Sequence, residues 1–157
     1  MLDDYIHAVD TARYVCGGEV MEIESRCKRI MVADINWIAA NLYFDSGASC
    51  YVSGSWTSGR RIFRVNMHAP GICADVELEK EAFIYAEGDY DGVRYDSKEI
   101  AGGDELFVYG GFQRKNREFI NSILSGKHET TSPFSDALKT MEVCETILAQ
   151  ALLKGEI

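Results

Sequence analysis

Residues 2–23 read LDDYIHAVDTARYVCGGEVMEI, and this stretch decides the fold. Residues 3–16 have the composition and spacing of a helix that is apolar on most sides. The pair Gly17-Gly18 ends this helix, because glycine readily takes the left-handed conformation found after a helix. Residues 19–30 then alternate polar and apolar side chains, which predicts a strand. The chain is therefore expected to begin with a helix, a glycine turn and a strand.

Four polar residues of the first helix recur at spacings of four, three and four: Asp3, His7, Asp10 and Tyr14. At 100° per residue they fall within about 60° of one another on the helix. Because the rest of this helix is mostly apolar, it is expected to be buried, with the polar stripe facing a partner or a cavity. A histidine with a carboxylate four residues earlier is typical of a proton-transfer site. The alternative is a structural role, in which an aspartate caps the helix and the histidine and an aspartate only hydrogen-bond each other.

The middle of the chain is rich in short strands, and its end is helical. Turns separate the strands, and Asp45-Ser46-Gly47 predicts a hairpin. After Gly110-Gly111 the apolar period changes to that of a helix. Strands are expected at 35–47, 48–59, 60–68, 72–79, 81–88 and 91–97, and helices at 113–126 and 133–154. This order predicts one α+β domain over residues 1–157, with a largely antiparallel open sheet and helices packed on one face.

Composition excludes several classes of function. The net charge of −9 disfavours nucleic acid and anionic membranes as partners, since both require a positive surface. No apolar run reaches the ~20 residues that span a bilayer, and no secretory signal is visible. The five cysteines contain no CxxC pair, which favours reduced thiols in the cytoplasm and no metal site. Neither GxGxxG nor GxxxxGK occurs, so no cofactor-binding residues are expected in this chain.

Two segments resemble a known family. The helix motif D-x-x-x-H-x-x-D falls on Asp3, His7 and Asp10, and a glycine turn and a strand follow it. The end, REFINSILSGKHETTSPFSDALKTMEVCETILAQALLKGEI, has a short helix closed by glycine, a loop and a final helix. Together they are similar to the C-terminal domain of the glucose–fructose oxidoreductase, inositol dehydrogenase and rhizopine-catabolism family (Gfo/Idh/MocA). In that family an N-terminal Rossmann domain precedes this domain, and the resemblance implies that the present sequence lacks it.

The resemblance also implies roles for the polar stripe. His7 would be the general acid/base for a substrate hydroxyl, and Asp3 would pair with it or relay its proton. Asp10 would be polar support in the substrate site, and Tyr14, to which the family motif assigns no role, would line the pocket. The substrate would be a sugar, an inositol or a related polyol. NAD or NADP would be bound by the missing domain, together with a Glu-Lys-Pro lysine, so this chain alone is expected to be inactive.

A homodimer is the expected assembly. By resemblance, the open face of the sheet packs on a second subunit, and residues 35–44 and 60–65 carry apolar side chains on both faces. The alternative is that helices of the same chain cover them. Two other functions stay open at this point. One is a stand-alone binding or assembly domain without catalysis, and the other is a hydrolase or isomerase that uses His7 with Asp3, for which no nucleophile motif is present.

Overall fold

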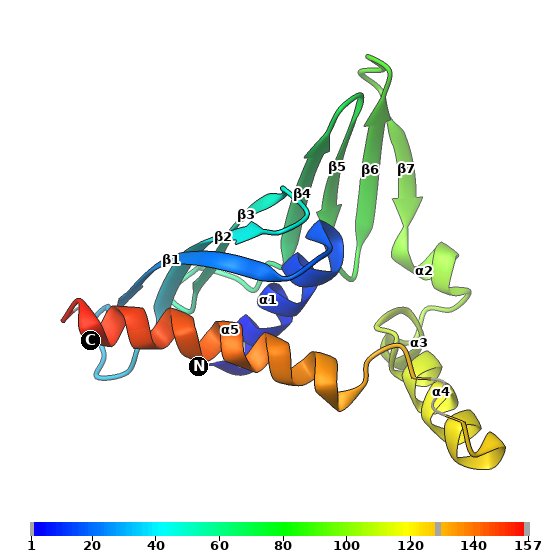
Figure 1. Cartoon of the computed structure of the whole chain (residues 1–157). Helices are drawn as coiled ribbons and strands as arrows, with labels where there is room; N and C mark the ends of the chain where they lie inside the picture. The colour runs from blue at the N-terminus through cyan, green and yellow to red at the C-terminus, as the bar shows by residue number, and fades with distance from the viewer. Residues whose placement is uncertain (1, 128–129, 156–157) are drawn as a thin grey trace. The chain divides into compact units, whose positions relative to one another are not determined.

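The computed structural model describes residues 2–127 and 130–155, and the side chains of residues 4–127 and 130–155. Helices stand at both ends of the chain, and strands lie between them (Figure 1). The elements are α1 (Leu2–Cys16), β1 (Val20–Lys28), β2 (Trp37–Phe44), β3 (Ser49–Ser55), β4 (Arg64–Ala69), β5 (Ile72–Glu77), β6 (Glu81–Ala86), β7 (Val93–Asp96), α2 (Ser97–Ala101), α3 (Leu106–Tyr109), α4 (Phe112–Ser125) and α5 (Phe134–Leu153). The α+β class predicted from the sequence is confirmed.

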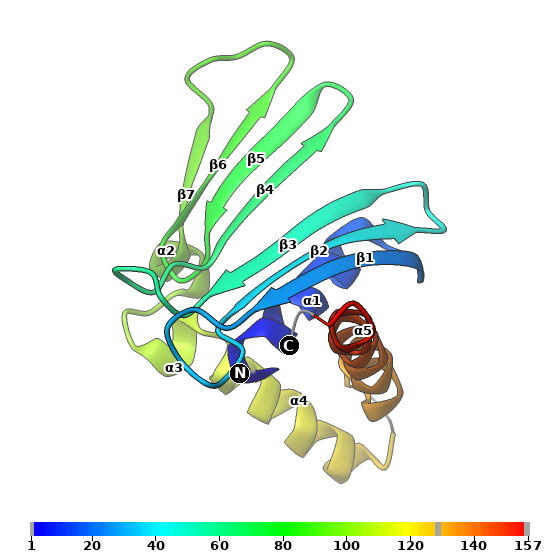
Figure 2. The same cartoon turned by 90° about the vertical axis from the view of Figure 1, so that its left-hand side faces the viewer.

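The chain divides into two compact units. Unit 1 comprises Met1–Arg60 and Ser132–Ile157, and unit 2 comprises Arg61–Thr131. The strands form two sheets where the sequence analysis expects one: β1-β2-β3 in unit 1 and β4-β5-β6-β7 in unit 2 (Figure 2). All neighbouring strands are antiparallel, as predicted. The prediction of a single domain over the whole chain stays a prediction.

Unit 1 has its core between one face of the sheet and the helices α1 and α5. Alternate residues of β2 point into this core, and Ile38 and Leu42 are fully buried there. Helix α1 contributes Tyr5 and Val9, four residues apart on one helical face, and α5 contributes Ile147. Burying each large apolar side chain stabilises the fold by about 1.5–3 kcal/mol. The expected placement of helices on one face of a sheet is therefore seen in unit 1.

The glycine turn after α1 is required by its surroundings. Gly17 and Gly18 both have positive φ, at 65° and 76°. A Cβ atom on Gly18 would lie 2.0 Å from Oδ1 of Asp45, the atom that accepts a hydrogen bond from the Glu19 amide at 2.9 Å. The turn thus ties the start of β1 to the hairpin between β2 and β3. This confirms the helix–turn–strand order predicted from residues 2–23.

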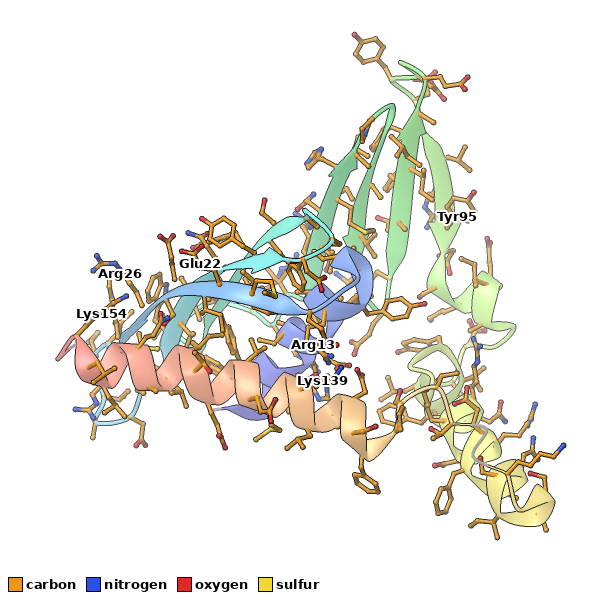
Figure 3. All side chains as sticks on the ribbon, viewed as in Figure 1. Arg13, Glu22, Arg26, Tyr95, Lys139 and Lys154 are labelled. Carbon is orange, nitrogen blue, oxygen red and sulfur yellow. The ribbon has the colours of Figure 1, made fainter. Side chains whose placement is uncertain are left out.

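Helix α5 covers the free edge of β1 with polar side chains. The Gln150 side-chain amide donates to the carbonyl oxygen of Ile23 at 2.7 Å and accepts from the amide of Ser25 at 3.1 Å. Lys154 donates to the carbonyl oxygen of Ser25 at 2.8 Å, and Figure 3 shows it beside the C-terminal half of β1. These bonds satisfy backbone groups that an exposed edge strand would offer to another chain.

Unit 2 is a four-stranded sheet followed by three helices. One face of its sheet is apolar and half-exposed, and it includes Val65, Met67, Val76 and Ile84. The opposite face carries charged pairs such as Arg94 with Glu81 and Arg64 with Glu77. Helix α2 is capped at its N-terminus by Asp96, whose carboxylate accepts from the amides of Lys98 and Glu99. Helix α4 contacts α3, and none of its side chains is buried.

Candidate functional site

The polar stripe of α1 lies on the exposed side of the helix in unit 1. His7 and Asp10 are exposed, and the side chain of Tyr14 is 89% exposed, whereas Tyr5 and Val9 are buried on the opposite side. The expectation of a helix buried on nearly all sides was therefore wrong, because only one face of α1 packs on the core. Asp3 belongs to α1, but its side chain lies outside the described residues. The stripe thus faces away from the core of its own unit.

The His7 side chain is exposed on the surface of unit 1. Among the described side chains none forms a hydrogen bond with its imidazole, and its predicted partner Asp3 lies outside that set. The backbone carbonyl of His7 accepts from the Thr11 hydroxyl at 2.7 Å, a bond within the helix.

Asp10 has partners on α5 and on its own helix. The hydroxyl of Thr140, which is 1% exposed, donates to Oδ1 of Asp10 at 2.8 Å. The same hydroxyl oxygen accepts from Nη1 of Arg13 at 2.7 Å, and Nη1 lies 4.0 Å from Oδ1 of Asp10. Asp10 therefore stands at the junction between the exposed stripe and a buried polar network.

Arg13 is the centre of that network. It is 8% exposed, and its guanidinium donates to both the backbone oxygen (3.1 Å) and Oδ1 (2.9 Å) of Asp136 in α5. Glu19 lies 3.9 Å from the guanidinium and also pairs with Lys139, which Figure 3 shows beside Arg13. A charge taken out of water is costly unless it is paired and hydrogen-bonded. These partners satisfy most of the guanidinium donors and fix α1 against α5.

Sequence reasoning found the stripe and missed the network. Arg13 follows Asp10 by three residues, which is a visible signal for a pair on one helix surface. Thr140 and Asp136 are more than a hundred residues away in the chain, so no local pattern connects them with α1. Two open grooves of about 430 and 450 Å³ lie in unit 2, one at Phe107 and Phe112 and the other at Asp96 and Lys98, and neither is lined by a residue of the stripe.

No metal or membrane element is found among the described residues. No group of three His, Cys, Asp or Glu side chains within 2–127 and 130–155 is placed to hold a metal ion. None of the helices in the same ranges is long and apolar enough to cross a membrane.

Comparison with known proteins places the fold. No family model and no curated protein sequence matches the chain. Several solved structures are similar to the chain. One is a dehydrogenase from Clostridium difficile, with a TM-score of 0.80 and 20% identity over 94% of this chain and 46% of that chain. Levoglucosan dehydrogenase in complex with NADH and levoglucosan follows (0.81, 16%, 96% and 47%), and aldose-aldose oxidoreductase from Caulobacter crescentus complexed with glycerol is similar (0.74, 17%, 96% and 44%).

The chain has the fold of a dehydrogenase C-terminal domain. It spans less than half the length of the structures it matches. Within this C-terminal-domain fold, the segments that carry the sequence resemblance fall on α1 with β1 and on α4 with α5. Both helices of the Arg13 network, α1 and α5, thus belong to those segments.

Proposed function

We propose that this chain is the substrate-binding and dimerisation domain of an NAD(P)-dependent oxidoreductase of the Gfo/Idh/MocA family. Its substrate is a sugar, an inositol or a related polyol. The observation that supports this most is the fold likeness to dehydrogenases over 94–96% of the chain, including one solved with NADH and levoglucosan and one with glycerol. The exposed His7 on α1 supplies a proton-transfer group on the same fold. A cytoplasmic location is part of the proposal.

In this proposal the chain's own residues move the proton. NAD or NADP, bound by a domain outside this sequence, supplies hydride chemistry at a substrate carbon. His7 accepts the proton of the hydroxyl that becomes a carbonyl, and Asp3 relays it or holds the imidazole in place. Asp10 offers the carboxylate oxygen that Thr140 leaves open, which can accept a bond from a second substrate hydroxyl. Tyr14, largely exposed in this chain, closes one side of the pocket.

The dimer proposal rests on the sheet of unit 2. The apolar side chains on one face of this sheet, such as Val76 and Ile84, are only partly buried. An apolar sheet face of this kind is buried most readily by another sheet. The measurement is sedimentation of the chain and of two neighbouring variants. Ile84→Glu changes the apolar face and should yield monomers, whereas Phe83→Glu, on the opposite face of the same strand, should leave dimers. Dimers in both variants would place the interface elsewhere.

The decisive experiment begins with the coding DNA upstream of Met1. The proposal expects an open frame that encodes a strand, a GxGxxG turn, a helix and a Glu-Lys-Pro segment. The encoded full-length protein is then assayed for NAD⁺ and NADP⁺ reduction with sugars, inositols and polyols. A stop codon directly before Met1, with no turnover by the chain, would favour the stand-alone binding or assembly domain.

The role of His7 is tested in that full-length protein. His7→Ala should lower kcat by about 10²–10⁴-fold, the usual contribution of a general acid/base, with the Kd of the cofactor unchanged. Asp10→Asn should cost less, because it keeps an oxygen that can accept from Thr140. His68→Ala, a histidine of β4 in unit 2, is the matched control and should leave kcat unchanged. An unchanged kcat in His7→Ala would refute the acid/base role.

A further inference from the structure

The sheet of unit 1 has an outer face that is turned away from its helices. Ile38 and Leu42 point into the core with α1 and α5, so the residues that alternate with them point outward. Figure 3 shows Glu22 and Arg26 on the side of β1 away from α5. Four rows of side chains make up the outer face, and they run from Glu22, Glu24, Arg26 and Lys28 of β1 to their partners in β2 and β3.

The outer face has the composition of a protein interface. Nζ of Lys28 lies 4.7 Å from the centre of the Trp37 ring. The side-chain amide of Asn41 and the hydroxyl of Tyr43 donate to Oε2 of Glu24, both at 3.4 Å. Tyrosine, tryptophan and arginine are enriched where proteins meet. The outer face therefore presents aromatic and charged groups that their neighbours already hold in position.

The charges on the outer face are ordered along β1. Glu22 and Glu24 occupy its first half, and Arg26 and Lys28 occupy its second half, all four exposed. In a two-fold symmetric dimer one patch contacts itself, so residue i faces residue j and residue j faces residue i. A two-fold axis that crosses the strands at Ser25 places Glu24 opposite Arg26 of the second copy. The same axis places Glu22 opposite Lys28 of the second copy.

The same axis also matches large side chains with small ones. Tyr51 of β3 is 64% exposed, and it would face Ser53 of the second copy. Asn41 would face Ala39 of the second copy, and Ala39 is only 7% exposed, which leaves room above it. An axis along β2 would instead place β1 on β3, which carries serines and a tyrosine on this face. The four charges would then lose water without gaining an opposite charge, which is costly.

We propose that the outer face of unit 1 packs on the same face of a second copy of this chain, about a two-fold axis that crosses the strands between Glu24 and Arg26. Sheets that pack face to face in this way interdigitate their side chains. The inference rests on the dimerisation proposed above and not on the redox chemistry. It adds the contact that fixes how the two copies are oriented.

The size of the outer face shows how it works together with unit 2. Three strands ~4.8 Å apart and four rows ~6.7 Å apart give about 400 Å² on each copy. The total of about 800 Å² is below the ~1,200–2,000 Å² of a stable interface. The outer face alone therefore orients the dimer but does not hold it. The apolar face of the unit 2 sheet must contribute as well, which agrees with monomers in Ile84→Glu.

The test uses two double variants of the chain, each with charges of one sign on the outer face. The basic variant carries Glu22→Lys and Glu24→Lys, and the acidic variant carries Arg26→Glu and Lys28→Glu. Sedimentation should show that the Kd of self-association rises by about 10²-fold or more in each, because like charges then face each other. Far-UV circular dichroism checks that both variants are folded. The single changes Glu24→Lys and Arg26→Glu replace a double variant that does not fold.

An equimolar mixture of the two variants tests the symmetry itself. Every acid of one variant then faces a base of the other, so native mass spectrometry should find heterodimers and few homodimers. A general loss of structure would not restore association in the mixture. The matched control combines Arg114→Glu with Lys127→Glu, at α4 and just after it, and changes the net charge as much as the acidic variant does. It should associate like the wild type, because salt screens charges that are far from the interface.

Three results would overturn the inference. One is self-association of both variants at the wild-type Kd, and another is a mixture without heterodimers. Either would leave the dimer proposed for unit 2 standing. The third is a wild-type chain that stays monomeric, which would overturn the dimer as well. None of these results bears on turnover by the full-length protein, which tests the oxidoreductase function separately.

Discussion

Replacing Arg13 by methionine tests whether the buried network joins α1 to α5. Methionine keeps an unbranched apolar chain in the space of the arginine stem and removes the guanidinium. The substitution takes away the bonds to Thr140 and to the backbone and side-chain oxygens of Asp136. Because Thr140 is buried and Arg13 nearly so, water cannot easily replace the donor at Thr140.

The magnitude follows from the burial of each partner. The side chain of Asp136 is 49% exposed, so solvent screens its ion pair with Arg13, which is worth about 1 kcal/mol at most. The bond to the buried Thr140 hydroxyl is a charged hydrogen bond, and its loss together with the backbone bond costs about 1–2 kcal/mol. We expect Arg13→Met to reduce the free energy of unfolding of unit 1 by about 2–3 kcal/mol. This is a large share of the ~5–15 kcal/mol that is typical of a domain.

Urea unfolding followed by tryptophan fluorescence is the suitable assay. Both tryptophans, Trp37 and Trp56, lie in unit 1, so their signal reports this unit by itself. The matched control is Lys139→Met in α5, which also removes one positive charge but breaks only the exposed pair with Glu19. It should cost no more than about 0.5 kcal/mol. Equal losses in Arg13→Met and Lys139→Met would refute the argument from burial.

Two other contacts give predictions of the same kind. Gln150→Leu removes the bonds from α5 to Ser25 and Ile23 at the edge of β1, so the free energy of unfolding of unit 1 should fall by about 1–3 kcal/mol in the same fluorescence assay. Asp96 has a lowered pKa because the amides of Lys98 and the following residue donate to it. A carboxylate of this kind contributes stability above its unfolded pKa, and the contribution is lost as the pH falls through its folded pKa. The Lys98 amide resonance should therefore shift at a pH below about 4, and Asp96→Asn should abolish the shift.

Local patterns in the sequence were sufficient for most elements of the fold. The glycine pair after α1, the hairpin turn at 45–47 and the helical period of α4 and α5 each depend on neighbouring residues. The short helices α2 and α3, of five and four residues, were not predicted, because such lengths show no period. The distribution of strands over two sheets also escaped prediction, since pairing between strands is decided by contacts beyond the hairpin.

The candidate site was predictable where it depends on helical geometry alone. The spacing of His7, Asp10 and Tyr14 placed them on one face of α1, and the structure places them there. The expectation that α1 is buried on nearly all sides was wrong, because the sequence of one helix does not say which side its neighbours cover. The buried Arg13 was overlooked for the same reason, as its partners on α5 come from the far end of the chain.

The position of Asp10 links the stability of unit 1 to the proposed chemistry. Its carboxylate holds the Thr140 hydroxyl, which in turn receives the guanidinium of Arg13, so a change at any of the three alters the other two. The hydroxyl proton of Thr140 can point to only one acceptor, and its contact with Arg13 fixes it on Asp10. Thr140→Val would therefore leave Asp10 without this donor and Arg13 with one acceptor fewer. Residues that contact no substrate can in this way orient a residue of the exposed stripe.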